Sequence, residues 1–235
     1  MGCGREVDIY QLKHVKYSSH YWIVKLLNRG SRPLSILDVG GADGYLGAIL
    51  KKQGHHVIGV EADPARAKKA MGSYDRVHLA DIETFDFPYL EEFDLILFAD
   101  VLEHLREPSA VLRRALPCLK QNGEIIVSVP NVANFIIRIG LLLGRFEYTD
   151  RGILDRTHLR FFTLASLRRM LTDDGWAIVE IRVTPLPVQL VMPATDKKIF
   201  LPLHEVHYGI VRLWKTVFAY QFVVRALRTS SNRGA

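Results

Sequence analysis

The densest group of residues that could do chemistry lies in residues 35–50, SILDVGGADGYLGAIL. This stretch holds four glycines and two aspartates between two apolar runs. Glycine lets a backbone approach a ligand closely, and the amides at the start of a following helix favour polar or anionic groups. The residues therefore predict a turn that binds a small molecule, with Asp38 beside it.

The spacing of the glycines separates two kinds of ligand loop. A dinucleotide-binding loop needs glycine at i, i+2 and i+5. Counted from Gly40, the second and third of those positions hold Ala42 and Tyr45, so that fingerprint is absent. The spacing i, i+2, i+4 instead selects Gly40, Ala42 and Gly44, with Gly41 between them. Alanine fits such a turn if its φ is negative.

Two acids follow apolar runs further along the chain. Glu61 ends the run at residues 56–60, and Asp81 follows the run at residues 76–80. A carboxylate at the end of a strand can accept hydrogen bonds from both hydroxyls of a ribose. An acid in this position can also be a helix cap, so both roles stay open.

The segment ADVLEHL places Asp100, Glu103 and His104 within one or two turns of chain. Carboxylates and an imidazole at this spacing could ligate a cation, act on a substrate proton or serve as ordinary caps. We expect His104 to act on the acceptor side of the site.

A second polar cluster, residues 150–160, contains His158 among aspartates and arginines. A titratable histidine between charges of both signs favours contact with an acceptor. The structural alternative is that Asp155 pairs with Arg160 to hold the loop while Phe161 and Phe162 enter the core.

Short apolar runs alternate with helical patterns, which is typical of a parallel sheet covered on both faces. Asp63 is a predicted N-cap, and Pro64 a predicted first helical residue. The fold class is therefore α/β, with a Rossmann-like, doubly wound, mostly parallel sheet. Ligands bind beyond the carboxyl ends of such strands, so the glycine turn and the acids should meet there. The predicted strands are residues 35–39, 56–60, 76–80, 93–98, 123–129 and 177–183.

Composition narrows the class of protein. A chain of 235 residues with 49% hydrophobic and 24% charged residues suits one globular domain with a full core. Only Cys3 and Cys118 are present, which argues for a reduced compartment and against a disulfide scaffold or a zinc site. With no signal-peptide pattern, we expect a cytoplasmic protein. The net charge of +6 indicates attraction to something anionic: nucleic acid, a phosphorylated small molecule or a lipid surface.

Five motifs resemble, in order, those of the class I S-adenosylmethionine-dependent methyltransferases: LDVGGADG, VIGVEAD, LADIETF, FDLILFADVLEHL and LKQNGEIIVSVPN. The resemblance implies S-adenosylmethionine as cofactor. It places Asp38 near the ammonium end of the donor, Glu61 on the ribose and Asp81 at the adenine. The donor-binding residues implied are Asp38, Gly40, Gly41, Ala42, Gly44, Glu61, Ala62, Asp81, Ile82, Ala99 and Asp100.

Two further resemblances concern the acceptor. ADVLEHL is similar to the E-x-x-E-H motif of quinone-biosynthesis O-methyltransferases, which implies a divalent cation in some members; we assign no metal here. GILDRTHLRFFT, residues 152–163, resembles a lid found in methyltransferases of glycan pathways. We therefore predict methyl transfer to an acceptor hydroxyl on a sugar or lipid-linked glycan intermediate. A quinone or phenol O-methyltransferase, and a donor-binding protein without activity, are the alternatives.

Nucleic-acid methyltransferases are not indicated. Amino methyltransferases of nucleic acid carry Asn/Asp-Pro-Pro-Tyr after the fourth strand, where this chain has ADVLEHL. Cytosine C5 enzymes need a Pro-Cys nucleophile at that point, whereas Pro117 and Cys118 come near the end of the next helical pattern. We therefore expect no nucleic-acid partner and a small-molecule or lipid-linked acceptor.

The chain is divided into three parts. Residues 1–30 are expected to form an N-terminal helical cap, and residues 31–185 the catalytic domain that binds S-adenosylmethionine. Within that domain, residues 131–163 are the expected lid. Residues 186–235 are expected to form a C-terminal appendage with an amphipathic helix.

The amphipathic helix is predicted at residues 208–220, where Leu213 and Trp214 share a face opposite Arg212. Packing on the core, a homodimer contact and peripheral contact with a membrane all fit this pattern. An acceptor on a lipid carrier would explain both this helix and the apolar residues 135–143.

Overall fold

The computed structural model describes residues 16–28, 32–187 and 201–229. Seven strands form one sheet: β1 (Ser35–Val39), β2 (His56–Glu61), β3 (Arg76–Leu79), β4 (Phe93–Ala99), β5 (Leu119–Pro130), β6 (Trp176–Thr184) and β7 (Gln221–Arg228). The helices are α1 (Ser19–Leu27), α2 (Tyr45–Lys52), α3 (Pro64–Ala70), α4 (Pro108–Ala115), α5 (Phe135–Leu142), α6 (Leu164–Asp173), α8 (Leu201–Leu213) and α9 (Lys215–Phe218), with short 3-10 turns η2 (Leu102–His104) and η3 (Leu116–Cys118).

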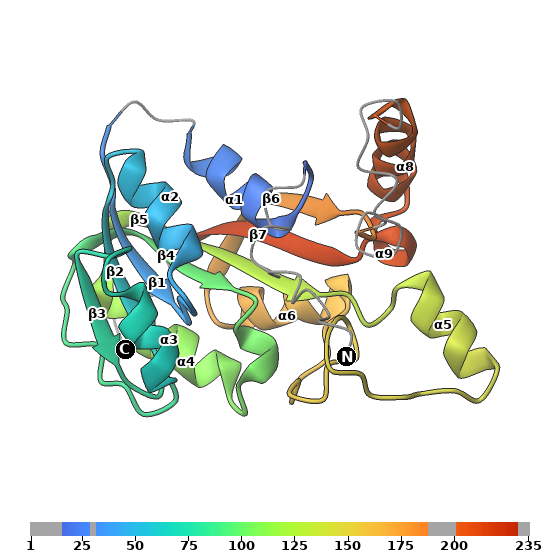
Figure 1. Cartoon of the computed structure of the whole chain (residues 1–235), viewed down its shortest axis with the longest axis horizontal. Coiled ribbons are helices and arrows are strands. Elements are labelled where there is room, and N and C mark those ends of the chain that lie inside the picture. The colour runs from blue at the N-terminus through green and yellow to red at the C-terminus, as the bar shows by residue number, and fades with distance from the viewer. Residues whose placement is uncertain (1–15, 29–31, 188–200, 230–235) are drawn as a thin grey trace, which may run out of the picture.

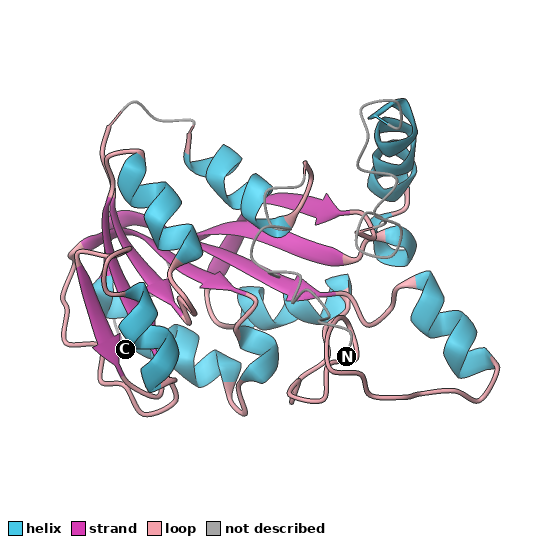
Figure 2. Cartoon of the chain, viewed as in Figure 1, coloured by secondary structure: helices cyan, strands magenta, loops and turns pink. Residues whose placement is uncertain are grey.

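The strand order is β3-β2-β1-β4-β5-β7-β6 (Figure 1). α1 and α2 lie above the sheet in this view, and α4 and α6 lie below it (Figure 2). β1 to β5 pair in parallel, and the middle of β4, Leu95–Phe98, is fully buried because helices cover both faces. This arrangement confirms the predicted Rossmann-like fold class.

β7 is the main departure from the sequence prediction. It runs antiparallel to both neighbours, between β5 and β6, and Phe222, Val223 and Val224 are fully buried. The prediction of a C-terminal appendage is therefore wrong for residues 221–228, which form a central strand. Their consecutive β-branched and aromatic residues suit a pleated, buried strand better than a helix.

The expected helix at residues 208–220 is broken. α8 ends at Leu213, Trp214 caps α9, and α9 is only a short helix. α8 is attached to the expected N-terminal cap: the rings of Tyr208 and Tyr17 stack at 3.8 Å between centroids, and Glu205 accepts a hydrogen bond from Tyr17 at 2.5 Å. In the described residues, α1 represents that cap.

α1 packs on the sheet at β6 and β7. Ser18 caps it by accepting from the Tyr21 amide at 3.2 Å. The indole Nε1 of Trp22 donates to the Val183 carbonyl at 3.1 Å in a buried contact. The cap is thus joined to β7 and β6, the last two strands in the order of the sheet.

The insertion after β5 has two parts. α5 projects from the body at the right of Figure 1, and none of its residues is buried. The following chain returns to the body, where Asn131 forms a β-bridge with Phe162. No helix within the described part of the chain has the length and hydropathy needed to cross a membrane.

Candidate active site

The glycine turn joins β1 to α2 with three residues in the left-handed region. Gly40, Ala42 and Gly44 have φ of 72°, 47° and 83°. We predicted that alanine fits this turn if its φ is negative, and the φ of Ala42 is positive. A hydrogen bond holds its backbone, because the Ala42 amide donates to Oε2 of Glu61 at 2.8 Å.

Tyr74, which the sequence analysis missed, lies under this turn. Its hydroxyl donates to Oδ2 of Asp38 at 2.7 Å, and both residues are buried. A Cβ at Gly41 would lie 2.4 Å from that hydroxyl, so this glycine is needed for packing as well as for any ligand. Burial, together with the Asp38 carboxylate, raises the pKa of Tyr74 far above its usual value, which keeps it a neutral donor.

Glu61 lies at the end of β2, beside the turn, with 8% of its surface exposed. Its two oxygens each accept from a backbone amide, Oε2 from Ala42 and Oε1 from Asp63 at 2.9 Å. Each carboxylate oxygen keeps a further lone pair, so the group can still accept hydrogens from a ribose. The amides orient the carboxylate in advance of a ligand.

The remaining predicted donor residues lie along the same edge of the sheet. Asp81 is exposed and accepts from the Glu83 amide at 2.9 Å, so its side chain is engaged in a turn. Ile82 is buried, whereas Ala62 is exposed. Ala99 ends β4 and is half-buried. The carboxyl ends of β1 to β4 thus bring all predicted donor residues to one edge.

Asp100 follows β4 and has a φ of 57°. Its Oδ1 accepts from Oγ of Ser128 at 2.5 Å and from Nε2 of Gln221 at 3.2 Å. These contacts turn it toward β5 and β7. Gln221 could not be associated with Asp100 from sequence, because that requires β7 in the sheet.

His104 and His158 meet. Their ring centroids are 4.8 Å apart, and the rings are nearly perpendicular. Nδ1 of His158 lies 3.1 Å from the Ile153 carbonyl oxygen. Nδ1 of His104 lies 3.2 Å from both the carbonyl oxygen and Oγ1 of Thr157.

These contacts determine the tautomers. A carbonyl oxygen only accepts, and Oγ1 of Thr157 donates its own proton to Asp155 at 2.7 Å. Both Nδ1 atoms therefore carry a proton, so the lone pair of a neutral ring lies on Nε2. Burial lowers the pKa of His158, with the His104 charge contributing, so His158 is neutral near pH 7.

The lid is joined to η2 through backbone. The amides of Leu159 and Arg160 both donate to the Glu103 carbonyl, at 2.8 and 2.9 Å. Arg160 pairs with Glu107 at 3.0 Å, so the expected pairing of Asp155 with Arg160 is wrong. Phe162 is buried, as expected for a core contact.

Tyr220 is a second site residue that sequence reasoning missed. It immediately precedes β7, and its hydroxyl would lie 3.1 Å from a Cβ at Gly152 in the lid. Burial, with the charges of Asp100 and Asp155, raises the pKa of Tyr220 to about 12. A neutral phenol therefore lies between the lid and Asp100.

Glu103, His104 and His158 could form a metal site, since their ligand atoms lie within 4.8 Å of one another. Imidazole nitrogens and a carboxylate suit zinc or iron, and their bonds to zinc are about 2 Å long. The three atoms would have to draw closer around an ion. Asp100, which the sequence motif suggested as a ligand, accepts from Ser128 and Gln221 instead.

Comparison with known proteins gives the family. A family model described as a methyltransferase domain matches residues 12–181. The chain belongs to this family. The motif order therefore gave the correct family.

Two curated relatives are named ubiquinone biosynthesis O-methyltransferase. The protein of Bradyrhizobium diazoefficiens is 32% identical over 155 residues, which cover 63% of this chain and 60% of that protein. The protein of Azorhizobium caulinodans is 29% identical over 163 residues, covering 65% and 64%. The aligned part spans less than two thirds of either relative.

Solved structures confirm the fold. A magnesium protoporphyrin IX methyltransferase from Synechocystis, with bound S-adenosylhomocysteine, superposes with a TM-score of 0.61 at 16% identity, covering 90% of this chain and 82% of that one. A methyltransferase from Thermotoga maritima, a possible histamine N-methyltransferase, gives 0.62 at 18% identity, covering 94% and 93%. The Rossmann-like methyltransferase fold is thus shared with proteins of different acceptors.

Proposed function

We propose that the protein transfers the methyl group of S-adenosylmethionine to a phenolic hydroxyl of an apolar acceptor. The observation that carries this proposal is the His104–His158 pair, in which contacts with the lid hold both rings and leave the lone pair of neutral His158 on Nε2. His104 follows β4, at the same edge of the sheet as the glycine turn, and His158 in the lid meets it there. The names of the curated relatives favour a quinone-pathway acceptor over the glycan acceptor that we predicted first.

The chemistry requires an aligned methyl group and a base. The methyl–sulfur bond breaks as the methyl–oxygen bond forms, and the hydroxyl proton passes to an imidazole Nε2. The products are S-adenosylhomocysteine, a methyl ether and a protonated histidine, which then loses its proton to water. Alignment of oxygen, methyl and sulfur supplies most of the rate.

The acidity of the acceptor distinguishes a phenol from a sugar. A phenol ionises near pH 10, as tyrosine does, whereas an alkyl hydroxyl is a far weaker acid, nearly as weak as water. His158 is a weak base because burial lowers its pKa below 6.5. Such a base is better matched to a phenol. A divalent cation held by Glu103, His104 and His158 would occupy the same Nε2 lone pairs, and would then polarise the hydroxyl as a Lewis acid in place of the histidine base.

The test is a pair of assays with S-adenosylmethionine and either an alkyl-substituted catechol or a methyl glycoside, with product detected by mass spectrometry. We expect a gain of one methyl group on the catechol alone. Methylation of the glycoside alone would restore the glycan acceptor. If calorimetry shows S-adenosylhomocysteine binding and neither probe is methylated, the phenolic proposal is rejected.

A further inference from the structure

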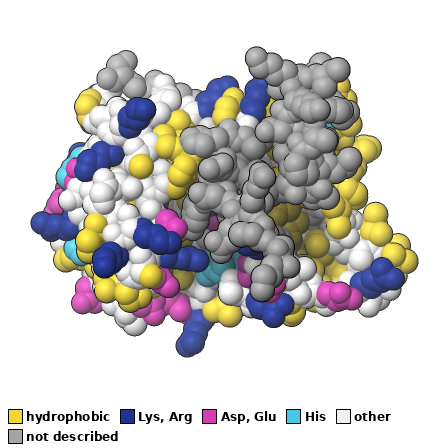
Figure 3. Space-filling model, viewed as in Figure 1, with side chains coloured by type: hydrophobic (Ala, Val, Ile, Leu, Met, Phe, Trp, Pro, Cys, Tyr) yellow, Lys and Arg dark blue, Asp and Glu magenta, His cyan; other side chains and the backbone are white. Residues whose placement is uncertain are grey.

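One side of the molecule exposes more apolar surface than the rest of the described chain. We call it the apolar face. Leu142, Leu213 and Trp214 have 86%, 77% and 64% of their surface exposed. In Figure 3, hydrophobic side chains gather along the right-hand edge, over the positions of α8 and α5. The large exposed hydrophobic residues of this face are Ile136, Ile139, Leu141, Leu142, Leu143, Phe146, Tyr148, Val206, Ile210, Leu213 and Trp214.

α5 and the residues that follow it contribute most of this face and have few packing contacts with the rest of the protein. All residues from 141 to 150 are exposed. Its attachments are at its start, where Asn134 donates to the Ala219 carbonyl at 2.9 Å and the Phe135 ring lies 5.4 Å from the Phe218 ring. A helix of eight residues is marginal in water without packing, so this apolar segment needs a covering surface.

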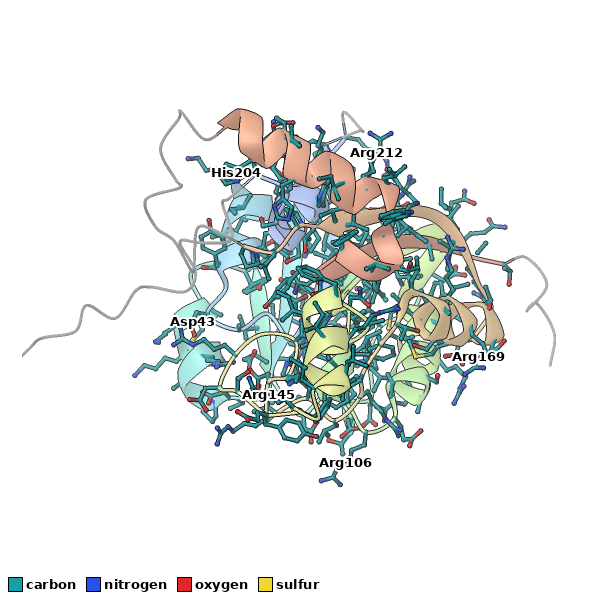
Figure 4. The ribbon with its side chains drawn as sticks, turned by 90° about the vertical axis from the view of Figure 1, so that its right-hand side faces the viewer. Asp43, Arg106, Arg145, Arg169, His204 and Arg212 are labelled. Atoms are coloured by element: carbon teal, nitrogen blue, oxygen red, sulfur yellow. The ribbon has the colours of Figure 1, made fainter. Side chains whose placement is uncertain are left out.

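α8 presents its apolar residues in the same direction. Tyr208 and Val211 are the buried residues that attach it to the body. Ile210, Leu213 and Trp214, which the sequence suggested could pack on a core, face outward instead. Figure 4 looks onto this side, with α8 across the top and α5 in the centre.

Cations border the apolar face. Arg145 lies at the end of α5, and Arg212 lies on α8 (Figure 4). Arg138 on α5 and Lys215 on α9 add two more positive charges, and none of the four forms an ion pair with a described residue. Glu205 on α8 is neutralised by Lys16 at 2.6 Å. In the exposed stretch of residues 141–150, the acids are Glu147 and Asp150, and Asp150 pairs with Arg156 at 3.0 Å.

We propose that the apolar face binds an anionic lipid bilayer, with α5 and the α8–α9 junction inserted at the level of the headgroups. Aliphatic and aromatic side chains bordered by arginine and lysine are the composition that such an interface takes up. A protein partner would not require unpaired cations on both helices. The inference stands on surface composition and does not depend on which acceptor is methylated.

The position of the face relative to the site gives this binding a role. The chain that follows α5 carries His158, and the chain that follows α9 carries Tyr220. Asn131 and Asn134 tie the two segments together, since both side-chain amides donate to the Ala219 carbonyl at 2.9 Å. Binding at the face would therefore hold the acceptor side of the site at the lipid surface.

Co-sedimentation of the full chain with vesicles tests the proposal, using phosphatidylcholine alone or mixed with phosphatidylglycerol. We expect binding only to the mixed vesicles, and its loss in high salt. Arg145→Gln with Arg212→Gln should weaken binding by about fivefold for each cation, the equivalent of about 1 kcal/mol. Leu142→Glu with Leu213→Glu should abolish binding, because it puts charge into the inserted layer.

One control removes an equal positive charge elsewhere, and the other adds a negative charge at an exposed leucine outside the apolar face. Lys52→Gln with Lys68→Gln changes exposed cations on α2 and α3, and Leu90→Glu changes a leucine that is 75% exposed in the connection to β4. Both control variants should bind like the wild type. A thermal melt on each variant checks that it is folded.

Two outcomes would overturn the proposal. If the wild type does not bind the mixed vesicles, the face does not bind lipid. The same follows if folded Leu142→Glu with Leu213→Glu still binds them. If sedimentation velocity instead shows a dimer that these two substitutions dissociate, the face is a contact between two copies of the chain.

Discussion

Two sides of the sheet are built in different ways: the predicted donor side, with β1, β2 and β3, and the predicted acceptor side, with β5, β6, β7 and the lid. On the donor side, β1, β2 and β3 follow one another along the chain with one helix between each pair. On the acceptor side, β7 lies between β5 and β6. Just before β7, the Ala219 carbonyl accepts a hydrogen bond from Asn131, which is 88 positions away in the chain. The donor side is therefore specified by local patterns, and the acceptor side by pairing between distant segments.

This difference has a functional consequence. The loops on the donor side are set rigidly, as in the Ala42–Glu61 hydrogen bond and the Tyr74 hydroxyl under the turn. The acceptor side places its polar residues on an insertion and on the C-terminal segment. A rigid donor side and an acceptor side built from insertions suit a family that shares its donor and varies its acceptor, since function is carried by residues placed on a common fold.

The largest expected effect tests whether β7 is as central as β4. Phe222→Ala should lower the free energy of unfolding by about 3–5 kcal/mol, as should Phe98→Ala, because both side chains are fully buried. Chemical denaturation measures both. Val179→Ala, in β6 but half exposed, should stay within about 0.5 kcal/mol. A loss below about 1 kcal/mol for Phe222→Ala would return the C-terminal segment to the status of an appendage.

The second prediction concerns chemistry on the acceptor side. His158→Asn and His104→Asn should each lower turnover by about a hundredfold, because each removes a proton acceptor. Affinity for S-adenosylhomocysteine, measured by calorimetry, should not change. His78→Asn, in which a half-buried histidine bonded to Tyr89 is replaced, is the control on the donor side.

The pH profile sharpens this prediction. A histidine with a lowered pKa keeps its lone pair at pH values where an ordinary histidine is protonated. If His158 is the base, activity should therefore fall only below pH 6.5, as the group takes up its proton. If both histidine variants lose activity only to the extent that they lose thermal stability, the two histidines have a structural role instead.

The sequence was informative where neighbours in the chain are also neighbours in space. Six of the strands, the Asp63 cap and the edge that gathers the donor residues follow from local periodicity. β7 did not, because an amphipathic helical pattern continued into it and its pairing with β5 is long-range. The roles of Tyr74 and Tyr220 were hidden for the same reason, since each depends on a contact with a distant loop.

The third prediction measures the preorganised donor side. Glu61→Ala should weaken S-adenosylhomocysteine binding by about 1–3 kcal/mol, because a charged acceptor of hydrogen bonds is lost. Asp75→Ala is the matched control: Asp75 also accepts from a backbone amide, that of Val57 at 2.8 Å, but at the other end of β2. The control should cost stability and leave binding intact. If both variants bind equally well, Glu61 does not contact the donor.

The smallest expected effect concerns Ala42, whose φ of 47° is unfavourable for any residue with a Cβ. Left-handed backbone costs a non-glycine residue about 1–2 kcal/mol. Replacing alanine by glycine removes that cost, but it lowers the free energy of unfolding by about 0.4–1 kcal/mol because the unfolded chain gains entropy. Ala42→Gly should therefore stabilise the protein by about 0.5–1 kcal/mol. Ala48→Gly, at an exposed position inside α2, should destabilise it by about 1 kcal/mol. Opposite signs in urea denaturation would show that Ala42 is held in a strained conformation, whereas equal losses would mean that Ala42 adopts an ordinary conformation in solution.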